Sequence, residues 1–179
     1  MGREVRRVPA NWQHPKYPDD CDDLAGQYVP LMNGRYAESA AEWDEGWAKW
    51  QEGFQRAYGK AGKWEPRDPE NSASRYNKYA GLRPSPDDYM PDWPESERTH
   101  FMMYENTSEG TPISPAFATP EELAHWLADT GASSFGNITA SYEAWLRIAN
   151  GGWAPSAVVE DGVFESGVSA LAAREGGAL

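Results

Sequence analysis

The sequence predicts an α+β fold, with an aromatic-rich long helix and a Pro-rich strap attached to a small antiparallel-sheet domain with two short helices. Three patterns indicate this fold: aromatic residues at helical spacing, a stretch dense in proline, and short strand and helix patterns that alternate near the C-terminus. We therefore expect an irregular N-terminal segment (1–35), a long amphipathic helix (36–62), the Pro/Tyr-rich strap (63–96) and a small α+β domain (97–179).

The N-terminal segment has few signs of regular structure. Its four prolines exclude a long helix, and only Glu4–Val8 is expected to be extended. An acidic run, Asp19–Asp23, surrounds the single cysteine, Cys21. Such a run is typical of a solvated loop, and cation binding is the alternative.

The long helix carries the clearest pattern in the chain. Its rings follow one another at steps of 4, 3, 4 and 4 residues, which places them on one stripe of an α-helix. Each ring can bury roughly 150–250 Å². The stripe should therefore pack on the C-terminal domain, on a second copy in a homodimer, or on a foreign protein. These predicted interface aromatics are Trp43, Trp47, Trp50, Phe54 and Tyr58. Two glycines inside the helix, Gly46 and Gly53, suggest the close approach of another backbone.

The strap combines six prolines with tyrosines and two tryptophans, which is typical of an ordered extended segment. One short helix is expected near Ser72–Tyr79. The α+β domain then begins with a buried strand, His100–Glu105, and an extended segment, Thr111–Phe117, which its prolines confine to a sheet edge.

Two short helices should follow. Thr119 is a predicted N-cap, with Pro120 at the first helical position and Glu122 completing a capping box. A second helix is expected from Thr139. Beyond it, Asp161-Gly162 predicts a type I′ hairpin between Ala157–Glu160 and Val163–Glu165. One more helical turn is expected near Ser169–Arg174.

The chain is acidic, with a formal net charge of −12. Residues 101–179 contain two Lys or Arg against ten Asp or Glu. Such a surface repels phosphate backbones and anionic lipid, so we expect no direct nucleic-acid binding and no membrane binding, but attraction to a protein with a basic surface. No apolar run reaches the ~20 residues of a membrane span. The single cysteine and the absence of a secretion-signal pattern favour a cytoplasmic location.

Catalytic patterns are weak. The histidines His14, His100 and His125 do not stand at metal-ligand spacing, so we expect no metal and no cofactor. Glu121, His125 and Asp129 share one helix face and could form a carboxylate–histidine site, although an exposed charged face is the more common meaning of this pattern. The sequence therefore predicts a protein that is not an enzyme.

Five segments of the chain resemble a family of small uncharacterised accessory proteins from bacteriophages and prophages. The segments are Arg6–Pro15, Glu97–Glu105, Thr107–Pro115, Pro120–Leu127 and Gly152–Ser156. The resemblance implies no particular activity or catalytic residue. It implies a phage accessory protein that acts on host machinery, a class that includes inhibitors of CRISPR and restriction systems.

Together these features predict a non-enzymatic phage protein that binds and inhibits a host defence protein, by presenting carboxylates that imitate nucleic acid. The predicted partner-binding acids are Glu121, Glu122, Asp129, Glu160, Asp161 and Glu165. One alternative is a homo-oligomer that sequesters a nucleotide or sugar, with aromatic rings on the base and Arg98 or Arg147 on phosphate. Another is a phage structural or assembly factor.

Overall fold

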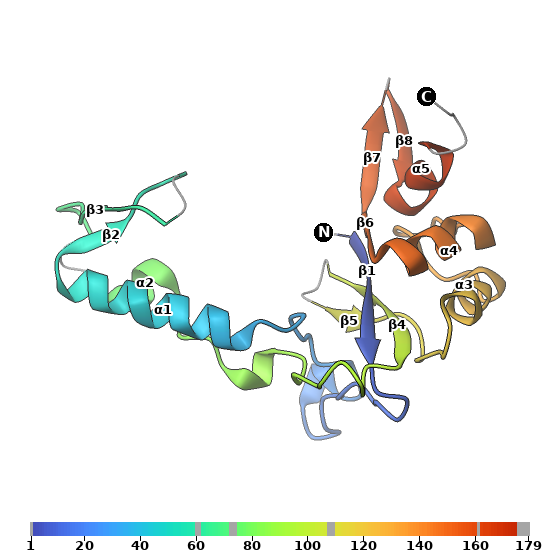
Figure 1. Cartoon of the computed structure of the whole chain (residues 1–179), viewed down its shortest axis with the longest axis horizontal. Helices are drawn as coiled ribbons and strands as arrows, with labels where there is room; N and C mark the ends of the chain where they lie inside the picture. Colours follow the sequence, from blue (N-terminus) through green and yellow to red (C-terminus); the bar gives the residue numbers. More distant parts are fainter. Residues whose placement is uncertain (1, 60–61, 72–74, 107–109, 161, 175–179) are drawn as a thin grey trace. The chain divides into compact units, whose positions relative to one another are not determined.

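The computed structural model describes residues 2–59, 62–71, 75–106, 110–160 and 162–174 and is built from helices and antiparallel sheets, as an α+β fold requires (Figure 1). The chain divides into two compact units. Unit 1 is Met1–Asn33 with Pro91–Leu179, and unit 2 is Gly34–Met90. Within the described residues no helix is both long and apolar enough to cross a membrane.

Unit 1 is organised around a four-stranded sheet whose order is β5-β4-β1-β6. The predicted strand His100–Glu105 is confirmed as β4, and it pairs antiparallel with β1 from Arg3↔Glu105 to Val8↔His100. The extended piece expected at Glu4–Val8 is therefore a central strand, so the segment 1–35 is not an independent irregular region. The strands are β1 (Gly2–Val8), β4 (His100–Glu105), β5 (Thr111–Pro112) and β6 (Trp153–Pro155).

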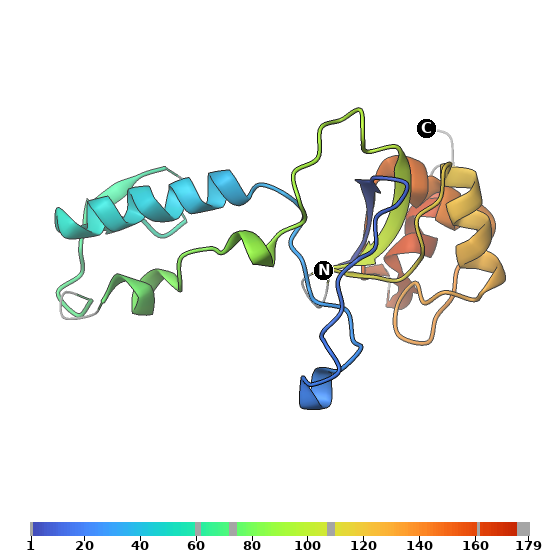
Figure 2. The same cartoon turned by 90° about the horizontal axis from the view of Figure 1, so that it is seen from below.

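Three helices lie on one side of this sheet, as Figure 2 shows. Together with Met103 of β4, these helices bury an apolar core. The large core side chains that the helices contribute are Leu123, Leu127, Trp145, Ile148 and Val168. The helices are α3 (Pro120–Asp129), α4 (Tyr142–Gly151) and α5 (Gly167–Arg174).

The predicted start is confirmed for α3 but not for α4. Thr119 caps α3 as predicted, because its hydroxyl accepts from the backbone N–H of Glu122 at 3.1 Å. The carboxylate of Glu122 accepts from the N–H of Ala118 instead of completing a capping box on Thr119. The prediction that the second helix starts at Thr139 is wrong, since Ser141 caps α4.

The C-terminal hairpin is confirmed as a pair of antiparallel strands, β7 (Ala157–Glu160) and β8 (Val163–Ser166), paired from Ala157↔Ser166 to Glu160↔Val163. The helical turn expected at its end is α5, which begins two residues earlier than predicted. A short 3-10 helix, η1 (Asp22–Leu24), lies in the acidic run.

Unit 2 contains the aromatic helix, but this helix is shorter than predicted. It ends at Gln51, two residues before Gly53, whose φ of +91° is outside the helical region. The chain then turns into a two-stranded sheet, and the predicted strap contributes its second strand and a short helix. The elements are α1 (Tyr36–Gln51), β2 (Phe54–Arg56), β3 (Trp64–Pro66), α2 (Tyr76–Ala80) and η2 (Pro86–Asp88).

Candidate functional site

The predicted partner-binding acids that the structure describes lie on two separate elements of unit 1, α3 and β8. Glu121 and Glu122 stand in the first turn of α3 and Asp129 is its last residue. These three side chains and that of Glu165 are exposed. Within the part of the chain that the structure describes, none of the four forms an ion pair. Of the other two predicted acids, Asp161 and the side chain of Glu160 lie outside the described residues.

Charge is distributed very unevenly between the units. Unit 1 carries seven Lys or Arg against 18 Asp or Glu, a net charge of −11. Unit 2 carries nine against ten, a net charge of −1. The acidic character of the chain therefore belongs to unit 1.

The predicted aromatic stripe is covered by a partner that the sequence analysis did not consider. Tyr76 of α2 lies among the tryptophans of α1, and its ring centroid is 4.9 Å from Trp43, 5.8 Å from Trp47 and 5.6 Å from Trp50. Trp50 is 3% exposed, whereas Trp47 is 43% exposed. Gly46 permits this packing, because a Cβ there would lie 2.0 Å from the hydroxyl oxygen of Tyr76.

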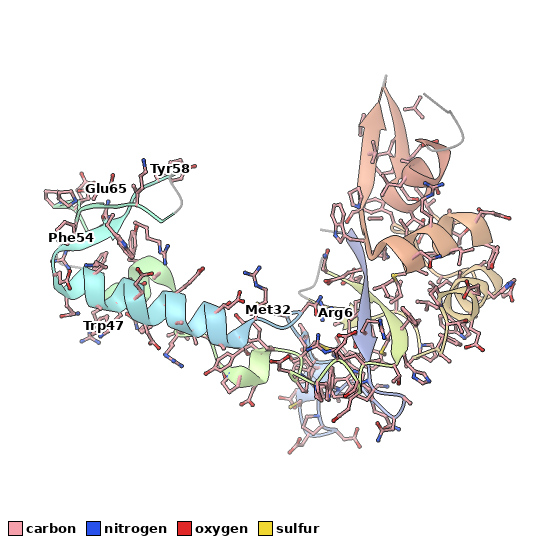
Figure 3. All side chains as sticks on the ribbon, in the orientation of Figure 1. Arg6, Met32, Trp47, Phe54, Tyr58 and Glu65 are labelled. Carbon is pink, nitrogen blue, oxygen red and sulfur yellow. The ribbon has the colours of Figure 1, made fainter. Side chains whose placement is uncertain are left out.

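Phe54 and Tyr58 do not belong to the stripe. Phe54 begins β2 and is 38% exposed, and Tyr58 follows that strand with its side chain fully exposed. Figure 3 shows both on the hairpin beyond the end of the helix that carries Trp47. The prediction of five rings on one helix is therefore wrong for these two, because Gly53 ends the helical geometry first.

A groove follows the tryptophans of α1. It has a volume of about 600 Å³. Two arginines, Arg67 and Arg75, line it together with two side-chain amides, and no acidic residue does. The full lining is Trp43, Trp47, Trp50, Gln51, Arg67, Arg75, Tyr76 and Asn77.

Unit 1 contains a buried polar network that sequence reasoning missed. Arg6 of β1 is 3% exposed, donates to the carbonyl of Leu31 at 2.6 Å and lies over the ring of Tyr104 at 4.3 Å. The hydroxyl oxygen of Tyr104 is 3.2 Å from Trp12 Nε1 and 3.1 Å from His14 Nδ1. The available signal was the position of Arg6 two residues before Val8, on the same face of a short strand as this buried residue.

The hydrogen-bond distances identify the tautomer of the neutral His14 ring in this network. Its Nε2 is 2.6 Å from the carbonyl oxygen of Val29, so Nε2 carries a proton and donates. In the neutral ring Nδ1 is then an acceptor that faces the Tyr104 hydroxyl, whose single proton can be donated either to this nitrogen or to the Met102 sulfur, 3.3 Å away. Burial lowers the pKa of His14, with a smaller contribution from the nearby charge of Arg6. Burial also raises the pKa of Tyr104 to about 12. Both groups are thus engaged in holding the N-terminal segment on the sheet.

A larger cavity, of about 940 Å³, lies beside this network. Trp12, His14 and Tyr28 line it together with Met102 and Ser114. Its one lysine, Lys16, lies over the ring of Tyr28 at 4.7 Å. The cavity is mostly apolar and carries no convergent set of acids and bases.

The remaining candidates from the sequence are dispersed. The ring of His125 stacks on Tyr142 with centroids 4.1 Å apart, on the exposed face that also holds Glu121 and Asp129. Arg98 is held by Asp92 at 2.7 Å and by the carbonyl of Trp93. Among the described residues no group of His, Cys, Asp and Glu is placed to hold a metal ion.

Comparison of the chain with models of protein families, with curated proteins and with solved structures finds no match. Fold and surface therefore define an α+β protein with one acidic unit and one aromatic unit.

Proposed function

We propose that this protein is a non-enzymatic phage accessory protein that binds a host protein with a basic surface and inhibits it. The acidic face of unit 1 would occupy a site that nucleic acid otherwise fills. The observation that carries the proposal is the set of exposed carboxylates on α3 and β8, which have no ion-pair partner in the described part of a unit of net charge −11.

The position of Asp129 supports a binding role for this face. A carboxylate at the C-terminal end of a helix opposes the helix dipole, and α3 has no basic residue in its last turn to offset it. A residue that breaks a local rule without compensation is more often kept for function than for stability. Glu122 and Asp129 are two helical turns apart, about 10 Å along the axis. They share one side of the helix, so both can face one partner.

Electrostatic complementarity would mainly accelerate association. Rim charges steer encounter and change the association rate and its salt dependence more than they change the lifetime of a complex. A basic channel that binds nucleic acid is complementary in charge to these exposed carboxylates. A protein that fills the channel would compete with the nucleic acid directly. The resemblance to phage accessory proteins makes a host defence protein the expected partner.

The experiment compares two variants from which equal charge has been removed. Glu121→Gln/Glu122→Gln/Asp129→Gln neutralises α3, and Asp19→Asn/Asp20→Asn/Asp23→Asn neutralises three exposed acids elsewhere in unit 1. Each tagged protein is used to capture partners from infected cells. The captured proteins are identified by mass spectrometry, and their nucleic-acid binding is measured with and without the phage protein.

We expect the α3 variant to lose its principal partner and the control variant to keep it, with capture decreasing as salt increases. The partner should also lose nucleic-acid binding when the protein is added. Equal loss in both variants, or a partner that binds nucleic acid normally in the complex, would contradict the proposal. Recovery of the chain in purified virions would instead favour a structural role.

A further inference from the structure

The groove on unit 2 offers a flat aromatic surface that the packing of the unit leaves partly open. The rings of Trp43 and Trp47 are nearly parallel, with an interplanar angle of 14° and centroids 6.1 Å apart. Trp43 is fixed by a hydrogen bond of 3.1 Å from its Nε1 to the carbonyl of Gly81. Trp47 stays 43% exposed at the wall of a hollow of about 600 Å³. That volume is typical of small-molecule sites, which span about 300–1,000 Å³.

Positive charge is held beside these rings. The guanidinium carbon of Arg67 lies 4.7 Å from the ring centroid of Trp50, and its Nη1 donates to the carbonyl of Trp50 at 3.3 Å. A guanidinium has five N–H donors, so this bond leaves others for a ligand. Arg75 is exposed and adds a second guanidinium. Because no acidic residue lines the groove, an anionic group is favoured there.

Two amide side chains complete the lining. Gln51 and Asn77 are both exposed, and each offers a donor and an acceptor in one plane. Asn and Gln use this pair to recognise the edge of a nucleobase, most often adenine. Flat rings, guanidinium groups and amides thus occur together within one groove.

We propose that this groove binds a free nucleoside phosphate, with a purine base stacked on Trp47 and the phosphates between Arg67 and Arg75. Aromatic rings stack on any base, and a purine offers the larger face. Arginine binds phosphate through paired, charge-assisted hydrogen bonds. A long nucleic-acid strand is disfavoured, because the groove supplies two arginines and unit 2, with a net charge of −1, has no excess of positive charge to neutralise further phosphates. The site is independent of the acidic face on unit 1.

The first test is calorimetric titration of the full chain with ATP, adenosine, tripolyphosphate and the oligonucleotide dA6. We expect saturable binding of ATP, with adenosine and tripolyphosphate each weaker by about tenfold or more, since each lacks half of the recognised groups. Binding of dA6 should also be weaker than that of ATP. Absence of saturable ATP binding, tripolyphosphate binding equal to that of ATP, or tighter binding of dA6 would overturn the proposal.

Variants locate the site. Trp47→Ala should weaken ATP binding about tenfold or more, and Trp47→Phe should restore part of the loss because a stacking face remains. Arg75→Gln should weaken ATP but leave adenosine unchanged. Trp153→Ala is the matched control, because Trp153 is 49% exposed and belongs to unit 1. Thermal unfolding checks that each variant is folded. If Trp47→Ala unfolds, Trp47→Phe and Arg75→Gln still decide the outcome. An equal loss in Trp153→Ala, or no loss in Arg75→Gln, would contradict the site.

Discussion

The two units bury their side chains in different ways. Unit 1 has a four-stranded sheet and a contiguous core in which Met103, Leu123, Leu127 and Trp145 are completely buried. Unit 2 has a two-stranded sheet and ten aromatic residues among its 57, but its large buried rings are few: Trp50, Tyr76 and Tyr89. A layered unit is stabilised by one contiguous apolar core, whereas unit 2 depends on a few ring contacts, of Trp50 with Tyr76 and of Tyr89 with Tyr36.

The first prediction concerns local stability and has the largest expected effect. Backbone amides of α1 should exchange with deuterium much faster than those of the β1–β4 pair, by about a hundredfold or more, because few buried contacts hold unit 2. Hydrogen-exchange mass spectrometry measures both regions in one experiment. Equal protection of α1 and β4 would show that the ring cluster is as effective as the core of unit 1.

The second prediction tests a close approach in unit 1. Gly110 has a φ of +107°, and a Cβ there would lie 2.1 Å from the carbonyl oxygen of Leu31 and 2.5 Å from Nη2 of Arg6. We expect Gly110→Ala to lower the free energy of unfolding by about 3 kcal/mol, because both backbone strain and a clash arise. Gly26→Ala is the control: its φ is +72°, but nothing lies within 4 Å of the added carbon. Urea unfolding should show the larger loss for Gly110→Ala, and equal losses would exclude the clash.

The third prediction is pH dependence from the buried network. The lowered pKa of His14 means that the unfolded chain binds a proton first as pH falls, so stability should decrease below about pH 6.5. The pKa of Tyr104, raised to about 12, means that stability is complete below about pH 10 and is lost as pH rises toward 12. The alkaline loss should reach about 1.4 kcal/mol at pH 11, where about one pKa unit of the shift has been lost.

Two variants separate these effects. Tyr104→Phe should remove most of the alkaline dependence, and His14→Gln should reduce the acid dependence. Thermal unfolding between pH 5 and pH 11 follows both, and profiles identical to that of the unmodified chain would contradict the role given to the network.

The fourth prediction has the smallest effect and tests the ring cluster of unit 2. An alanine at position 46 should favour the helix by about 1 kcal/mol, but its Cβ clashes with the Tyr76 hydroxyl, so Gly46→Ala should be destabilising by about 1 kcal/mol overall. Adding Tyr76→Phe removes that oxygen, and the double variant should be more stable than Gly46→Ala alone. If the second change gives no recovery, the contact does not limit packing.

Local signals in the sequence were sufficient for several elements. Thr119-Pro120 fixed the start of α3, and Asp161-Gly162 indicated the hairpin between β7 and β8. Helical spacing was misleading after Trp50, because Phe54 and Tyr58 continue the pattern at steps of four residues although Gly53 adopts a left-handed φ. Periodicity alone does not show where a glycine will end a helix.

The main features that the sequence did not reveal depend on contacts between distant residues. The burial of Arg6 follows from Leu31, Tyr104 and Gly110, which no local pattern connects to β1. Likewise, Tyr76 covers the tryptophans of α1 from about 30 residues further along the chain. The exposure of Glu121, Glu122 and Asp129 could be predicted from sequence, because exposed charge on an amphipathic helix is a local property. The groove lined by Arg67 and Arg75 could not be predicted from sequence, because its lining comes from separate segments of unit 2.

The division of roles between the units is tested most directly by measuring two activities on the same two variants. Partner capture and ATP binding are compared in Glu121→Gln/Glu122→Gln/Asp129→Gln and in Trp47→Ala, with thermal unfolding as the check of folding. We predict that the first variant no longer captures the partner but binds ATP with the affinity of the unmodified chain. The second variant should lose ATP binding and still capture the partner. Loss of both activities in either folded variant would contradict the account.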